Sequence, residues 1–263
     1  MTTTMPQLKI ERRVVAREGA EISDLPPQRL TTRMCDFHEC QNYEKLNKCS
    51  RCRSAMYCSK NCQKADWAQH KAICQLSVDF PRPVDPETGR EPPLNRHLRL
   101  WTARFEGSLL CAVIPALELN KHPENIDKFG LVVVLQPRPH PEPGARFALR
   151  SATVMPMDGI VEIMGVERVK AQGASVMQLH RERRAALRES SAGDEDYATV
   201  VVIATNTGPH KLPGPSAAEI RFKPVNIYGE MVRSPQLIDP ELDWHLDLSV
   251  QIDHDLPNQT IVP

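Results

Sequence analysis

The sequence predicts two folded parts of different kinds, a small metal-stabilised segment and a larger α+β domain. Between residues 35 and 74, seven of the 8 cysteines and one histidine fall into four close pairs. After residue 94, some stretches place apolar residues at helical spacing, and others are short runs of β-branched residues. Helical and strand patterns of mixed length along one segment are typical of an α+β fold.

Composition divides the chain into four segments. Residues 1–30 are polar and show no lasting periodicity, so we expect a flexible leader. The paired cysteines predict a zinc-stabilised finger over residues 31–76. A stretch dominated by proline and charge predicts a linker over residues 77–93. The remaining residues, 94–263, form the predicted α+β domain, in which no known functional motif is found.

The overall composition argues against several classes of protein. The chain has 33 basic and 33 acidic residues, so no global field attracts nucleic acid or anionic lipid. No apolar run approaches the roughly 20 residues that span a bilayer, and residues 1–30 lack the apolar core of a secretory signal. We therefore expect an intracellular protein of the nucleus or cytoplasm, where paired cysteines bind metal more often than they form disulfides.

Helices of the larger domain are predicted from apolar residues three or four positions apart. One helix begins at Leu94, and Gly107 and Pro115 are expected to bend or divide it. A second helix is predicted over residues 166–189. A final helix begins near Pro240, and the residues expected to face inward from it are Leu242, Leu246 and Leu248.

Strands of this domain are predicted from short apolar or β-branched runs. The strongest is TVVVIA at residues 199–204, and LVVVL at residues 131–135 is consistent with a buried strand. The other predicted strands cover residues 147–154, 160–164, 220–222 and 225–228.

The paired residues have the spacing of metal ligands, C-x4-C-x8-C-x2-C-x5-C-x3-C-x7-H-x3-C. Eight thiolate or imidazole donors are enough for two tetrahedral zinc ions. The C-x2-C pair forms a tight turn, and ligands four residues apart lie one helical turn apart on the same side. Helix formers between residues 59 and 74 predict two short helices. The candidate ligands are Cys35, Cys40, Cys49, Cys52, Cys58, Cys62, His70 and Cys74.

Residues 49–74, CSRCRSAMYCSKNCQKADWAQHKAIC, resemble the MYND-type zinc finger of a fungal-like member without a SET domain. The resemblance rests on the order of the eight ligands, a Tyr-Cys step at 57–58, a Cys-Gln step at 62–63 and an Asp-Trp pair at 66–67. RING and PHD fingers place their histidine earlier in the order. The resemblance implies two structural Zn²⁺ ions in a cross-brace. Cys35, Cys40, Cys58 and Cys62 would bind the first zinc, and Cys49, Cys52, His70 and Cys74 the second.

The first ligand pair departs from the usual C-x2-C pattern of the family. Four residues separate Cys35 from Cys40, and His38 stands at the position where the second cysteine is often found. His38 is therefore an alternative ligand to Cys40. We favour Cys40, because a C-x4-C variant is familiar among fungal-looking members and thiolate suits structural zinc.

The resemblance implies a protein-interaction module. Both zinc ions would have four protein ligands, so neither keeps the open position that hydrolytic chemistry needs. Some family members bind proline-rich peptides such as P-x-L-x-P in a shallow groove, and Ser50, Gln63 and Trp67 match their peptide-contacting positions. The Trp67 ring would stack on an extended proline segment, and the Gln63 amide would bond its carbonyls. Alternatively, Trp67 only packs over the zinc and Gln63 is solvated.

We therefore predict an interaction protein, acting as a regulatory adaptor, and not an enzyme. The Asn-His-Ser-Cys element of a SET methyltransferase is missing, as are the P-loop and G-x-S-x-G motifs. The alternative is an enzyme of unknown reaction in residues 94–263, with the finger as a recruitment module. Such an enzyme would need a deep pocket with converging titratable groups.

Partners other than proteins are disfavoured. With two zinc ions and seven thiolates, the finger has a net charge of about plus one, too little for a phosphate-binding surface. The basic stretch RERRAALR at residues 181–188 is interpreted as a charged helix end, with a nuclear-import or nucleic-acid patch as the alternative. No membrane contact is expected.

Overall fold

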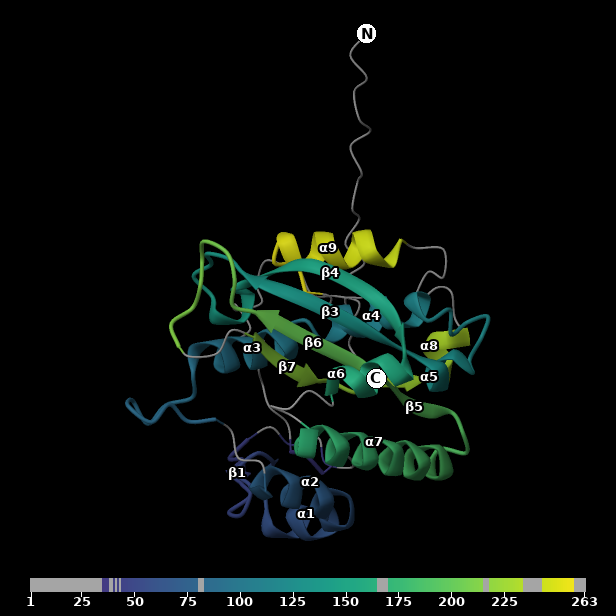
Figure 1. Ribbon diagram of the computed structural model, residues 1–263. Coiled ribbons are helices and arrows are strands. Elements are labelled where there is room, and N and C mark those ends of the chain that lie inside the picture. The colour runs from purple at the N-terminus through teal and green to yellow at the C-terminus, as the bar shows by residue number, and fades with distance from the viewer. Residues whose placement is uncertain are drawn as a thin grey trace, which may run out of the picture. The chain divides into compact units, whose positions relative to one another are not determined.

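The computed structural model describes residues 35–37, 40, 42, 44–79, 83–164, 170–214, 218–233 and 243–257 (Figure 1). The predicted leader and His38 lie outside these residues. Within them, no helix combines the length and the apolar character needed to cross a membrane.

The cysteine-rich segment consists of a short antiparallel ladder followed by two helices. Strands β1 (Asn47–Lys48) and β2 (Met56–Tyr57) pair with each other, and helices α1 (Lys60–Ala65) and α2 (Trp67–Asp79) follow. The two predicted short helices are thus confirmed. The hydroxyl of Ser59 caps α1 by accepting a hydrogen bond of 3.2 Å from the backbone N–H of Cys62.

The larger domain is built on a mixed four-stranded sheet of order β4-β3-β6-β7, which confirms the predicted α+β class (Figure 1). The two central strands, β3 and β6, are parallel, and both outer strands pair antiparallel to their neighbours. A separate antiparallel pair joins β5 to β8. The strands are β3 (Phe129–Pro137), β4 (Phe147–Pro156), β5 (Glu195–Ala198), β6 (Val200–Thr205), β7 (Ala218–Phe222) and β8 (Val225–Tyr228).

The helices of this domain occupy both faces of the four-stranded sheet. Because side chains of a strand alternate between faces, Leu131, Val133 and Leu135 of β3 enter one core and Val132 and Val134 the other. Helices α3, α4 and α9 cover the first face, and α6 and α7 contribute to the second core. The described helices are α3 (Pro93–Arg104), α4 (Glu106–Ala116), α5 (Asn125–Lys128), α6 (Met157–Met164), α7 (Lys170–Ser190), α8 (Gly229–Arg233) and α9 (Trp244–Asp253).

Two helix predictions need correction in detail. The predicted helix from Leu94 is divided at Phe105, which separates α3 from α4, and not at Gly107. Phe105 is fully buried and stacks on Trp101 at 4.9 Å between ring centroids, so core packing fixes this break. In α9, Leu248 is buried as predicted, but Leu246 is 58% exposed. Leu242 lies outside the described residues.

The predicted strand at residues 160–164 is wrong, because these residues belong to helix α6. The run is too short for its periodicity to separate a strand from a buried helical turn. Ile160 and Met164 are four positions apart on α6 and both enter the second core, which is the spacing of one helical face.

The boundaries of the predicted linker remain a prediction. Helix α2 continues to Asp79, and α3 begins at Pro93. The described residues between them, 83–92, contain no helix or strand. Pro93 at the first position of α3 suits a helix start, because its missing N–H would have no partner there.

Candidate metal centres

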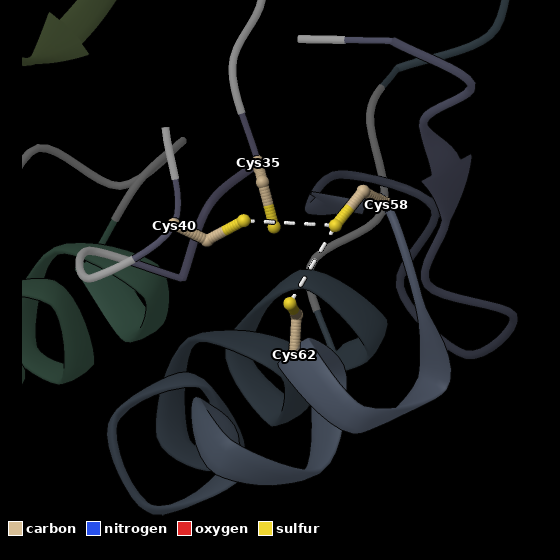
Figure 2. A group of neighbouring side chains, drawn as sticks. All are labelled: Cys35, Cys40, Cys58 and Cys62. Atoms are coloured by element: carbon tan, nitrogen blue, oxygen red, sulfur yellow. Dashed lines mark hydrogen bonds between the residues drawn. The ribbon is translucent and has the colours of Figure 1, made fainter. Parts of the chain in front are cut away.

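The first cluster consists of four cysteines that are distant in the sequence. Cys35 and Cys40 come from the segment before β1, Cys58 follows β2, and Cys62 lies on α1. Figure 2 shows their four sulfur atoms converging on one point. The Cys58 sulfur lies 3.6 Å from that of Cys40 and 3.5 Å from that of Cys62.

The second cluster consists of Cys49, Cys52, His70 and Cys74. Cys49 and Cys52 lie in the turn between the two short strands, and the other two residues lie one turn apart on α2. The sulfurs of Cys49 and Cys74 are 3.9 Å apart, and His70 Nε2 is 3.5 Å from the Cys52 sulfur. Only Cys52 of this cluster is more than slightly exposed.

Both clusters have the dimensions of a tetrahedral zinc site. Zinc–sulfur bonds of about 2.3 Å and zinc–nitrogen bonds of about 2.0 Å place two sulfurs about 3.8 Å apart, and sulfur and nitrogen about 3.6 Å apart. The observed separations of 3.5–3.9 Å match these values. In each cluster the four ligand atoms lie within 4.8 Å of one another. The donors therefore fit two structural zinc ions, the first held by four cysteines and the second by three cysteines and a histidine.

The protonation of the thiols also indicates that a cation is needed. Hydrogen bonds that the Cys58 thiol donates to the sulfurs of Cys62 and Cys40 raise the pKa of Cys58 to about 12, because ionisation of Cys58 would break them. Burial and a neighbouring thiolate at Cys49 raise the pKa of Cys74 to about 11. Several thiolates this close together repel one another, so they ionise together only when a metal dication neutralises them.

The ligand pairing is that of a cross-brace. The first and third pairs along the chain form one cluster, and the second and fourth pairs form the other. The two sites are therefore interleaved, and neither can form without most of the segment in place. Cys40 lies in the first cluster, whereas its alternative His38 is outside the described residues.

A buried polar and aromatic cluster holds His70 in position. The Tyr57 hydroxyl donates a 2.6 Å hydrogen bond to Asp66, and both residues are buried. The rings of Tyr57 and Trp67 meet the His70 ring edge-on, at 5.8 and 6.0 Å between centroids. In the sequence, the Tyr-Cys step and Asp66 are family markers only, whereas Trp67 is predicted to contact a peptide or to pack over the zinc. Their role here is to fix a zinc ligand between two rings.

The three predicted peptide-contacting residues all adjoin ligands of the second cluster. Ser50 is exposed and follows Cys49 directly. The amide of Gln63 donates from Nε2 to the Cys49 sulfur at 3.4 Å, a bond that sequence reasoning missed. Trp67 contacts His70 and is 37% exposed. The Trp67 ring therefore packs beside the metal site and also keeps part of its surface exposed.

Fold and site together define the segment as a cross-braced, double-zinc finger with closed metal coordination. The family model of the MYND finger matches residues 35–74. This chain therefore carries a MYND-type zinc finger, a class of protein-interaction module.

The similarity to the following known proteins covers only a short part of the chain. Egl nine homolog 1 of Homo sapiens is 53% identical over 38 residues, which are 14% of this chain and 9% of that protein. MYND-type zinc finger protein samB of Aspergillus terreus is 44% identical over 49 residues, 17% of this chain and 8% of that protein, and samB of Aspergillus niger gives the same values. The match thus spans less than a tenth of these relatives. No solved structure matches the chain.

Proposed function

We propose that this protein acts as a regulatory adaptor, whose finger recruits a protein partner by binding a proline-rich segment beside the second zinc site. The observation that supports it most directly is the placement of Ser50, Gln63 and Trp67 on the ligands of one cluster. Zinc would hold Cys49 and His70 in place. It would thereby also order Gln63, which bonds the Cys49 sulfur, Trp67, which contacts the His70 ring, and Ser50, which follows Cys49. A partner that binds this surface would then lose less conformational entropy, because metal binding has already ordered these side chains.

Each of the three residues offers a different interaction. The exposed part of the Trp67 indole is a flat aromatic surface for a proline ring. Gln63 uses one N–H on the Cys49 sulfur, which leaves its second N–H and its Oε1 for a peptide carbonyl and a peptide N–H. Ser50 supplies an exposed hydroxyl on the adjacent turn. An extended peptide with prolines on both sides of a non-proline residue suits this set.

The test measures binding of the zinc-loaded full chain to a fluorescent P-x-L-x-P peptide by anisotropy. Trp67 is 37% exposed, which for a tryptophan of about 250 Å² corresponds to about 90 Å² of indole. At about 25 cal/mol per Å² its burial contributes about 2 kcal/mol, so Trp67→Ala should weaken binding about 30-fold.

A matched control is Val78→Ala, which removes a 40% exposed apolar side chain near the other end of α2. This variant should bind the peptide as the parent does. The zinc content of both variants is measured, so that loss of binding can be separated from loss of metal. Equal affinities of Trp67→Ala and the parent, with zinc retained, would contradict the proposal.

The alternative, an enzyme in residues 94–263, requires titratable groups that can exchange protons near neutral pH. A cavity of about 740 Å³ does lie in this domain, and charged residues converge on it. Apart from Glu195, which bonds Asn226, its carboxylates and guanidiniums are, however, held in ion pairs with one another. Ion pairing lowers the pKa of Asp196 despite its burial and raises that of Arg188, so neither side chain is a good general acid or base. We therefore favour a binding role for this domain as well.

A further inference from the structure

The two metal centres differ in how far their ligands are exposed. In the first centre, three of the four cysteines are partly exposed, and only Cys35 is buried. In the second centre, three of the four ligands are at most 5% exposed, and only Cys52 is partly exposed. A reagent dissolved in the surrounding water therefore reaches most sulfurs of the first centre, but a single sulfur of the second.

The two centres also differ in the charge on their sulfurs. Four thiolates around Zn²⁺ give the first centre a formal charge of minus two, whereas three thiolates and a neutral imidazole give the second minus one. In the second centre, N–H groups also draw charge from sulfur. Gln63 Nε2 donates to the Cys49 sulfur at 3.4 Å, and the backbone N–H of Ser54 donates to the Cys52 sulfur at 3.4 Å. The first centre is therefore the more electron-rich, and thiolate character together with exposure favours oxidation of cysteine.

Within the first centre, Cys58 has the neighbours that a disulfide requires. Figure 2 shows its sulfur facing those of Cys40 and Cys62, which lie 3.6 and 3.5 Å away. Its main side-chain hydrogen bonds are to other cysteines, whereas the hydroxyl of Ser59 also bonds the Cys62 sulfur. The sulfur–sulfur bond of a disulfide is about 2 Å long, so a shift of about 1.5 Å joins Cys58 to either neighbour.

The surroundings of Cys52, the partly exposed cysteine of the second centre, are less suited to oxidation. Its sulfur lies 3.5 Å from His70 Nε2, and a nitrogen atom cannot complete a disulfide. The sulfurs of this centre that can do so belong to Cys49 and Cys74, which are 1% and 0% exposed. A disulfide here would have to form inside a closed core, so the second centre should react after the first.

We propose that Cys58 is a site of oxidation by hydroperoxides, and that its oxidation releases zinc from the first centre while the second centre stays loaded. The Cys58 thiolate attacks one oxygen of hydrogen peroxide, the O–O bond breaks, and a sulfenic acid and a hydroxide form. The thiolate of Cys62 or Cys40 then attacks the Cys58 sulfur, and the S–O bond breaks to give a disulfide and a second hydroxide. Two thiolates thus pass two electrons to one peroxide. The two cysteines left are half of the ligands that a structural zinc site uses.

Loss of the first zinc would reach the peptide-binding residues through α1. Cys62 lies on α1 directly before Gln63, so the first centre anchors the helix that carries this residue. Trp67 contacts His70 of the second centre and should keep its place. This consequence rests on the proposed function, and it predicts that the oxidised chain binds the P-x-L-x-P peptide more weakly than the reduced chain. Equal peptide affinities after loss of one zinc would contradict this link, whereas zinc release and disulfide formation are measured without any peptide.

The oxidation site is tested by titrating the zinc-loaded full chain with hydrogen peroxide in the presence of a chromogenic zinc chelator. The remaining thiols are then alkylated in denaturant, and the disulfide is located by mass spectrometry. One equivalent of peroxide should release one of the two zinc ions and leave a disulfide that contains Cys58. Release of both ions together, no release, a first disulfide within the second centre, or oxidation of Cys111 in place of Cys58 would overturn the proposal.

Two matched variants exchange one cysteine of each centre for another zinc ligand. Cys58→His keeps four donors but removes the thiolate that reacts, so the first zinc should stay bound at peroxide concentrations that release it from the parent. Cys52→His makes the same exchange in the second centre and should release the first zinc as the parent does. Two bound zinc ions before oxidation show that each variant is folded. Equal zinc release from Cys58→His and the parent would contradict the proposal. If Cys58→His does not bind two ions, the position of the disulfide in the parent decides it.

Discussion

The Asp196 carboxylate is the centre of a buried ionic network, and its loss should be costly. It accepts two hydrogen bonds from Arg184, one of 2.6 Å from Arg188, and one of 2.7 Å from the backbone N–H of Tyr197. The side chains of Asp196 and Arg184 are only 12% and 10% exposed. Replacing Asp196 with Asn keeps the shape but removes the charge that two guanidiniums face.

The expected loss of stability depends on the charges that remain unpaired after the substitution. Removing one partner of a buried ion pair costs about 3–5 kcal/mol, because the other charge is left unpaired. Arg184 would still contact Asp127 at 2.8 Å, but that carboxylate is 52% exposed and compensates only in part. We therefore expect Asp196→Asn to lower the free energy of unfolding by about 3 kcal/mol, at the lower end of this range.

The assay is urea unfolding at pH 7 of the zinc-loaded chain, followed by tryptophan fluorescence and circular dichroism. The control is Asp194→Asn, whose carboxylate is 52% exposed and pairs with the 67% exposed Arg233. This change should cost less than about 1 kcal/mol, because exposed pairs contribute little. The double variant Arg184→Met, Asp196→Leu should recover part of the stability that Asp196→Asn loses. Equal costs for the Asp196 and Asp194 variants would refute the reasoning.

Two further predictions concern the finger and the core. Cys74 is fully buried in the second cluster, so Cys74→Ser should lower the zinc content from two ions to one, as measured by mass spectrometry; two retained ions would contradict the cluster assignment. Burial lowers the pKa of His180 to about 4, so the unfolded chain binds a proton between about pH 6.5 and 4 that the folded chain does not. Stability should therefore fall by about 3 kcal/mol as the pH drops through this window. Substitution of His180 by Gln should remove that part of the pH dependence, and an unchanged difference between parent and variant from pH 7 to 4 would contradict it.

The zinc finger could be predicted from the sequence because its chemistry is local and restrictive. Few residue types bind zinc, and their spacing is limited by turns and helices, so four pairs in one order leave little choice. The bond from Gln63 to the Cys49 sulfur could not be predicted in this way, because it joins residues 14 positions apart through the fold of the finger.

The larger domain was predicted less completely, for reasons that individual residues show. The runs that became β3 and β6 are β-branched and buried, so hydrophobicity alone identified them. Residues 160–164 are also apolar but form part of α6, because a run of five residues does not reveal its period. Leu246 follows the apolar spacing of α9 and is nevertheless 58% exposed. Its exposure depends on which elements pack against α9, and the local sequence pattern does not predict that packing.

The basic stretch at residues 181–188 likewise has a local structure that the sequence predicted and long-range contacts that it did not. The sequence predicted a charged helix end, and α7 does contain these residues. It contained no sign that Arg184 is buried on Asp196, twelve positions away, or that Arg188 reaches Asp127, 61 positions away. These pairs depend on α7, β5 and α5 meeting in space.

By itself, the sequence determined the ligands, the finger family, the class of the larger domain and most of its strands. These follow from residue chemistry and from periodicity, which are both properties of neighbouring positions. Only the tertiary structure decided which part of Trp67 stays exposed, which charged side chains pair with one another, and that residues of six elements line a cavity. Such features arise from contacts between distant segments, and their energies are set by burial, which exists only once the chain has folded.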